Sequence, residues 1–238
     1  VDGLRGLRIG VARNYFGFDS RVDALMEDAI RLMRDRGAVI VENANVPNAD
    51  KYGTEELEVL LHEFKSGVNA YLSNLPASIP VHSLAELILW NEKNDDRELQ
   101  WFGQETFTQA QKRGALSSAA YKRAREKCVR LSRREGIDAV IKRTRCDLLI
   151  GPTGGPAWTI DLVTGDHFGG GVSTAPAVAG YPHLTVPAGR VAGLPIGISF
   201  FGAAWSEAQL FRAGYAFEQA SAHRVRPAFA QTVAATPR

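Results

Sequence analysis

Residues 147–202 read DLLIGPTGGPAWTIDLVTGDHFGGGVSTAPAVAGYPHLTVPAGRVAGLPIGISFFG, and this stretch is the most informative about the architecture of the chain. It contains three short apolar runs, at 148–150, 184–186 and 196–201, each bounded by Gly and Pro. Runs of this kind predict buried strands of a mixed sheet. Between the first two runs lie a long loop and a small-residue helix at 173–180. Because long irregular loops between buried strands often line a pocket, the stretch also predicts a binding site.

The residues before this stretch predict a strand–helix–strand unit followed by a helical region. A strand at 7–12 leads to a helix capped by Asp19 or Ser20 and ended at Gly37, and a second strand covers 38–46. Further helices are predicted over 54–73, 83–90, 102–114 and 118–143.

We interpret the chain as one core that is interrupted by a helical region. The mostly helical stretch 51–145 is predicted to be an insertion over a core that spans 1–224. Ser206 and Gln209 have the spacing of a capping box for a helix to about residue 220. Residues 225–238 are predicted to be a loosely held tail.

Three consecutive segments carry a family resemblance. S-T-A-P-A-V-A-G-Y-P-H-L-T-V-P-A-G at 173–189, G-L-P-I-G-I-S-F-F-G at 193–202 and A-Q-L-F-R-A-G-Y-A-F-E-Q-A at 208–220 resemble the C-terminal portion of amidase signature hydrolases. Within that family, the G-P-A-W and G-D-H-F turns of the long loop resemble the peptide amidase branch. The resemblance implies an α/β fold, a mixed β-sheet covered by α-helices, without the N-terminal part of the family core.

The family resemblance also implies a reaction whose catalytic groups we do not find here. Family members use a Ser nucleophile, a second Ser in a cis peptide and an upstream Lys, and no segment of this chain matches that pattern. We therefore interpret the chain as a C-terminal fragment and name no catalytic residue in it. The intact protein would hydrolyse carboxamide or C-terminal peptide amide bonds through an acyl-enzyme, with no cofactor. This chain would supply scaffold and pocket-lining loops and be inactive alone.

Two alternatives to the amidase fragment remain open. One is a non-catalytic binding or scaffold module of the same fold. The other is a self-sufficient hydrolase that uses Ser173 with His167 and an Asp. Ser173 lacks the G-x-S-x-G context of a nucleophile elbow, since Ala occupies position 175.

Five residues are predicted to bind substrate, and three of them have a second interpretation. Trp158 forms an apolar wall of the pocket or is buried under the loop. Asp161 recognises a polar or cationic group of the substrate or ties the loop to backbone N–H groups. Ser173 lines the pocket or caps a helix. The full set is Thr153, Trp158, Asp161, Ser173 and Thr174.

Composition and the remaining motifs narrow the class of protein. Hydrophobic residues make up 45% and charged residues 23%, which is typical of a soluble globular domain. With a net charge of +2, and the basic residues of 122–134 interpreted as a solvated helix face, no nucleic-acid partner is expected. No apolar run is long enough to span a membrane, so no membrane partner is expected. Subcellular localisation stays unknown.

Other reactive side chains are given structural interpretations. His62-Glu63 lacks a second His at position 66, so no metal is expected. Ser117-Ser118 is predicted to cap a helix, and Cys128 and Cys146 to be core residues. The expected partners are a small-molecule or peptide amide, the missing N-terminal portion and a second copy of the chain, because a sheet cut from a larger one exposes its edges.

Overall fold

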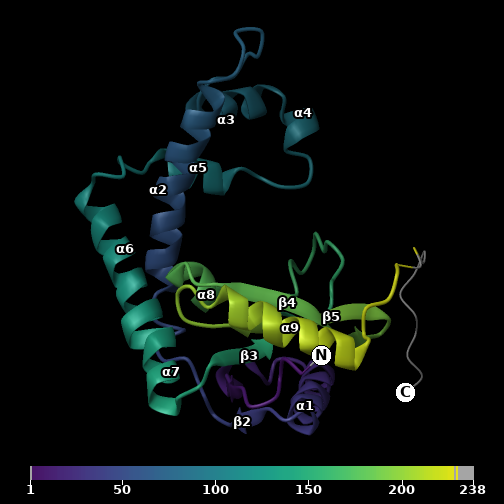
Figure 1. Ribbon diagram of the computed structural model, residues 1–238. Coiled ribbons are helices and arrows are strands. Elements are labelled where there is room, and N and C mark those ends of the chain that lie inside the picture. The colour runs from purple at the N-terminus through teal and green to yellow at the C-terminus, as the bar shows by residue number, and fades with distance from the viewer. Residues whose placement is uncertain (1, 228, 230–238) are drawn as a thin grey trace. The chain divides into compact units, whose positions relative to one another are not determined.

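The computed structural model describes residues 2–227 and 229, and two compact units are present (Figure 1). The first unit comprises the described residues of 1–49 and 130–238, and the second comprises 50–129. The predicted tail, 225–238, lies largely outside the described residues.

The first unit is built on a five-stranded mixed sheet in the order β2-β1-β3-β5-β4. The strands are β1 (Arg8–Val11), β2 (Val39–Val41), β3 (Leu148–Pro152), β4 (His183–Val191) and β5 (Leu194–Phe201). Strand β1 runs parallel to β2 and β3, whereas β5 pairs antiparallel with both β3 and β4. The predicted mixed α/β sheet is therefore confirmed.

Helices cover both faces of this sheet because successive strand residues point to opposite sides. On one face, α1 (Ser20–Asp35) and α9 (Glu207–Ser221) bury their apolar stripes; Ile9, Ile150 and Phe200 face these helices. On the other face, α7 (Asp138–Thr144) and α8 (Thr174–Ala179) pack over Leu149 and Phe201. In Figure 1, α1 and α9 can be followed in purple and yellow.

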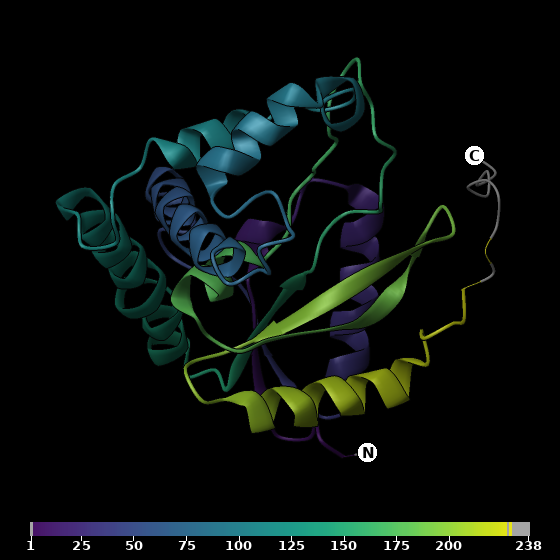
Figure 2. The same cartoon turned by 90° about the horizontal axis from the view of Figure 1, so that it is seen from above.

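The β4–β5 hairpin is longer than the sequence predicts. The apolar run at 184–186 extends to Val191 because a bulge between Pro187 and Gly189 restarts the pairing. Ala192 and Gly193 both have positive φ, as a tight hairpin turn between twisted strands requires. Figure 2 shows the hairpin as a long twisted ribbon.

Several predicted helix boundaries are confirmed, and others are wrong. Asp19 caps α1 through the N–H of Arg21, and Gly37 follows the helix with positive φ. The helix predicted over 118–143 is instead three elements: α6 (Ala119–Ser132), the π-turn η2 (Arg133–Ile137) and α7. The break falls at Gly136, whose φ and ψ are −121° and −107°.

The capping box predicted at Ser206 is also wrong. The Ser206 hydroxyl donates to the carbonyl of Ala203 at 2.7 Å instead of accepting from the helix. The strand predicted over 38–46 is only the three-residue β2, because Asn43 takes a left-handed conformation just after it.

The second unit is helical. It contains α2 (Gly53–Leu72), α3 (Leu84–Lys93), α4 (Asp95–Glu98), α5 (Glu105–Gln111) and most of α6. A small core of Leu61, Leu84 and Ala110 joins α2, α3 and α5. Ser83 caps α3 through the N–H of Glu86, and Ser118 caps α6 through that of Tyr121, as predicted.

Candidate functional site

The long loop between β3 and α8 leaves the centre of the sheet through a narrow stem. The N–H of Val172 donates to the carbonyl of Pro152, which joins the two ends of the loop. A Cβ at Gly171 would collide with the backbone carbonyl of Thr153, so only glycine fits there without a shift. On the outer side, Gly169 and Gly170 pack against the ring of Phe18. The stem is therefore held by backbone contacts that side chains would prevent.

Thr153 lies at this stem, in a network of hydroxyl and imidazole groups that we call the sheet network: Thr153, His183, Thr185 and Ser199. The Oγ1 of Thr153 is 2.6 Å from Oγ1 of Thr185 and 2.8 Å from Oγ of Ser199. Nε2 of His183 lies 2.6 Å from the same Ser199 oxygen. Burial of the His183 ring lowers its pKa, which favours the neutral imidazole in the folded chain.

From the sequence, Thr153 is predicted to bind substrate, and no role is predicted for the other three members of the sheet network. Alternation along β4 already puts His183 and Thr185 on one face of the strand. The alternation does not give the strand register, in which Ser199 is paired with Thr185 on one side and with Gly151 on the other.

Asp161 ties the tip of the loop together, which is one of its two predicted roles. Its Oδ1 accepts the N–H groups of Val163 at 2.8 Å and Thr164 at 2.9 Å, and its Oδ2 accepts the Thr164 hydroxyl. These hydrogen bonds, the Thr164 hydroxyl first, lower the pKa of Asp161 to about 2. The carboxylate is thus ionised and partly committed to the loop before any substrate binds.

Trp158 is not buried under the loop, because 44% of the residue is exposed. Its indole N–H donates to Oδ1 of Asp166 at 3.1 Å, and its ring meets Phe168 edge to face. The neighbouring apolar side chains Ile160, Leu162 and Val163 are exposed as well. The loop therefore presents apolar surface on an internally hydrogen-bonded frame, an arrangement suited to contact with an apolar group.

Ser173 is the N-cap residue of α8 and Thr174 is its first residue; both are exposed, whereas their neighbours Val172 and Ala175 are buried. The Ser173 side chain makes no capping hydrogen bond, so the helix-cap interpretation is wrong. Within the described residues, no hydrogen bond joins Ser173 to a histidine; His167 instead contacts Asp161 and Thr164. The arrangement that would activate Ser173 as a nucleophile is therefore not found in that part of the chain.

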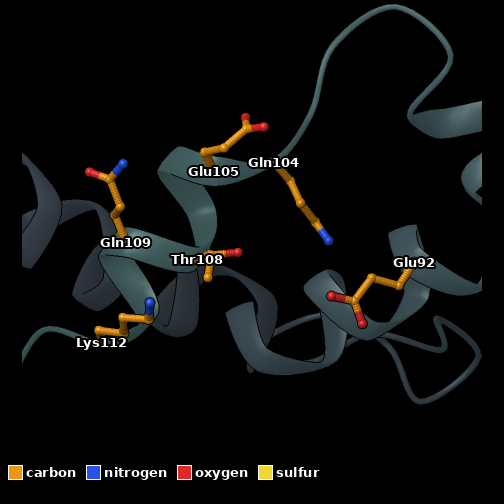
Figure 3. Close-up of a pocket in the computed structure, with 6 residues that line it drawn as sticks. All are labelled: Glu92, Gln104, Glu105, Thr108, Gln109 and Lys112. Carbon is orange, nitrogen blue, oxygen red and sulfur yellow. The ribbon is translucent and has the colours of Figure 1, made fainter.

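Metal-binding clusters and membrane-spanning helices are absent from residues 2–227 and 229. No group of three or more His, Cys, Asp or Glu side chains lies there that could hold a metal ion, and no helix there is long and apolar enough to cross a membrane. A cavity of about 390 Å³ between α3 and α5 is lined by polar side chains (Figure 3). Figure 3 shows Glu92 of α3 across from Thr108 of α5. This cavity shares no residue with the predicted site.

Comparison with known proteins gives one family. A family model described as amidase matches residues 2–211. A probable amidase of Arabidopsis thaliana is 34% identical over 235 residues, which are 96% of this chain and 41% of the plant protein. A glutamyl-tRNA(Gln) amidotransferase subunit of Desulforudis audaxviator is 30% identical over 239 residues, 95% of this chain and 47% of the bacterial protein.

Solved structures agree with the sequence relatives. A peptide amidase in complex with the competitive inhibitor chymostatin superposes with a TM-score of 0.87 at 41% identity, covering 96% of this chain and 46% of that one. The native peptide amidase of Stenotrophomonas maltophilia gives 0.85 at 40% identity, covering 96% and 45%. The chain thus spans less than half the length of each of these relatives.

Proposed function

Because this chain belongs to the amidase family, we propose that the whole protein hydrolyses carboxamide or C-terminal peptide amide bonds and that this chain forms the scaffold and one wall of the substrate pocket. The observation that carries the proposal is the match of nearly the whole chain to peptide amidases at about 40% identity. As in the reaction implied by the family resemblance, water replaces the amide nitrogen, so a peptide amide yields a peptide acid and ammonia.

The loop and the sheet network supply the groups that would bind such a substrate. The exposed rings of Trp158 and Phe168 offer an apolar surface for a side chain of the substrate. At the stem, the Thr153 hydroxyl offers a hydrogen bond to the polar amide. Ser173 and Thr174 offer two exposed hydroxyls at the start of α8. Asp161 would act mainly by holding the loop tip in shape.

We further propose that the chain alone does not hydrolyse the amide, because the described residues of the first unit show no activated nucleophile. The helical stretch 51–145 would be an insertion over the core. Completion of the pocket would come from an N-terminal portion of the family fold. Strand β4, at the edge of the sheet formed by the described residues, offers backbone groups for this portion.

The test is binding and turnover of a C-terminal peptide amide, with the corresponding peptide acid as control ligand. We expect the amide to shift the NMR signals of Thr153 and of the loop, and Thr153→Val to weaken that binding roughly tenfold, about 1.4 kcal/mol. Ammonia release by the chain alone should stay at the background rate. Turnover that disappears in Ser173→Ala would instead establish the self-sufficient hydrolase.

A further inference from the structure

The second unit contains a serine–histidine–carboxylate arrangement that the amidase proposal does not use. It joins α2, which carries Glu58 and His62, to the N-terminus of α6, where Ser118 lies. The Ser118 hydroxyl oxygen is 3.4 Å from Nε2 of His62. On the opposite side of the ring, Nδ1 is 2.9 Å from the backbone carbonyl of Glu58 and 3.4 Å from its carboxylate.

These contacts fix the tautomer of His62. A backbone carbonyl only accepts hydrogen bonds, so Nδ1 carries the proton and Nε2 presents its lone pair to Ser118. The ring is 2% exposed, and Tyr121 packs against it at 5.6 Å between centroids. Arg113 holds the Glu58 carboxylate from the other side, with Nε 2.9 Å from Oε2. The imidazole is therefore oriented as a base toward one hydroxyl.

A cavity of about 460 Å³ lies beside this arrangement. Its wall includes His62 and Lys65 from α2 and the turn Gly114, Ala115 and Leu116 that leads to Ser118. Among the described residues, the N–H groups of these three turn residues donate to no acceptor. Ser118 itself is not in this wall but lies two residues beyond Leu116, and backbone donors on a turn next to a nucleophile can stabilise an oxyanion.

We propose that Ser118, His62 and Glu58 form a second reactive centre, which takes acyl groups from small carboxylic esters. Oγ of Ser118 attacks the ester carbonyl while its proton moves to Nε2 of His62. The carbonyl–alkoxide bond breaks, and that proton passes to the leaving alcohol. Water then attacks the acyl-serine with His62 again as the base, which releases the carboxylic acid and restores the hydroxyl.

Ser118 also caps α6, and this role is compatible with the reaction. Its oxygen accepts the Tyr121 N–H at 3.4 Å, while its own proton remains available to His62. Ser117, the preceding residue, is exposed and contacts no histidine among the described residues. The chain therefore provides its own matched control for hydroxyl reactivity.

The experiment treats the pure chain with a fluorophosphonate reagent and locates the adduct by peptide mass spectrometry. We expect one equivalent on Ser118, none on Ser117, and labelling of Ser117→Ala at the unchanged rate. His62→Gln keeps the cap residue but removes the base, so labelling should slow on the order of 100-fold. Wild type should also release a burst of p-nitrophenolate from p-nitrophenyl acetate.

Circular dichroism melting confirms that each variant is folded before its labelling is scored. Ser118→Thr retains a capping hydroxyl and serves as a second variant if Ser118→Ala unfolds; it should label more slowly than wild type. Equal labelling of Ser117 and Ser118, no labelling at all, or a rate that survives His62→Gln would each overturn the proposal. None of these outcomes bears on the peptide amide pocket, which lies in the first unit.

Discussion

At the scale of the residue, the proposed pocket depends on glycines that allow two backbone segments to meet. Gly171 approaches the carbonyl of Thr153 so closely that a methyl group has no room. A Cβ added at Gly154, in the facing segment, would have its nearest neighbour, the carbonyl oxygen of Gly170, at 3.7 Å, which is an ordinary van der Waals separation. The two positions belong to the same loop stem but differ in how much substitution they should tolerate.

Replacing Gly171 by Ala should therefore destabilise the first unit by about 1–3 kcal/mol, as overpacking of a fitted site does. Chemical denaturation followed by tryptophan fluorescence measures the change. Gly154→Ala is the matched control and should fall within about 0.5 kcal/mol of wild type. Equal losses in the two variants would show that the close approach at Gly171 is not the cause.

The sheet network predicts a pH dependence of stability. The pKa of His183 is lowered in the folded state from its ordinary 6.5, so the unfolded chain binds the proton more readily. The contribution of the neutral ring is present above pH 6.5 and is lost as the pH falls from there through the folded pKa. Thermal unfolding between pH 7.5 and 5 should show a falling midpoint, and His183→Gln should flatten that fall. If the midpoint of His183→Gln fell with pH as steeply as that of wild type, the pH dependence would come from other titratable groups.

At the scale of the element, α9 shows how one helix separates core from surface. Phe217 is fully buried against Phe200 on β5, whereas Phe211 is 64% exposed on the same helix. The helix period places the two rings on different sides, although the sequence offers the same residue type at both.

Phe217→Ala should cost about 3–5 kcal/mol of unfolding free energy, because it removes contacts and leaves a cavity. Phe211→Ala should cost less than about 1 kcal/mol. The two variants are compared with wild type by their denaturant midpoints, provided that the dependence of the unfolding free energy on denaturant is the same in all three. A loss from Phe211→Ala as large as that from Phe217→Ala would mean that the exposed ring is covered in solution.

Several helices and strands were correctly predicted from the sequence, and others were not. Apolar runs bounded by Gly and Pro located β3, β4 and β5, and capping residues located the starts of α1 and α3. The break of the long helix was missed, because a single glycine inside a helical stretch does not by itself end the helix; in the structure Gly136 leaves helical φ/ψ, and a Cβ there would meet the carbonyl oxygen of Leu131 at 2.5 Å. Likewise, Ser206 has the spacing of a capping box, but its hydroxyl donates to the carbonyl of Ala203 instead of accepting a helix N–H.

In the candidate site, the type of a residue indicated its local hydrogen bonds, whereas contacts between distant residues could not be predicted. An Asp in a Gly- and Thr-rich loop was expected to bind backbone N–H groups or a ligand, and Asp161 binds backbone. Ser199 was not predicted, because only the strand register brings its hydroxyl next to Thr153 and His183. In the second unit, His62 meets a serine that lies 56 residues further along the chain, and no local pattern reveals such a contact.

At the scale of the whole molecule, the first unit exposes surface that isolated domains usually cover. The outer edge of β4 is unpaired within the described residues, and Ile160, Val163 and Phe168 are exposed on the loop. Pro187 and the bulge beside it interrupt the edge, which limits pairing to short segments. Association through the apolar loop is therefore favoured over sheet extension.

We expect the purified chain to self-associate at high concentration, and the double variant Ile160→Ser with Val163→Ser to do so less. Sedimentation velocity over a concentration series measures this. Phe211→Ser, an exposed apolar position on α9, is the control and should leave association unchanged. A concentration-independent monomer in wild type would contradict the expectation.

The contrast between stem and tip in the β3–α8 loop has a consequence for how such a protein diverges. Changes at the stem disturb a backbone fit shared with the core, so most would be removed by selection for folding. Changes at the exposed tip leave the sheet intact, and Val163, 94% exposed, has almost no contacts to lose. In the pocket proposed above, ligand preference would therefore change through the tip at little cost in stability, and a saturation library of residues 158–168 should retain folded members far more often than one of 169–172.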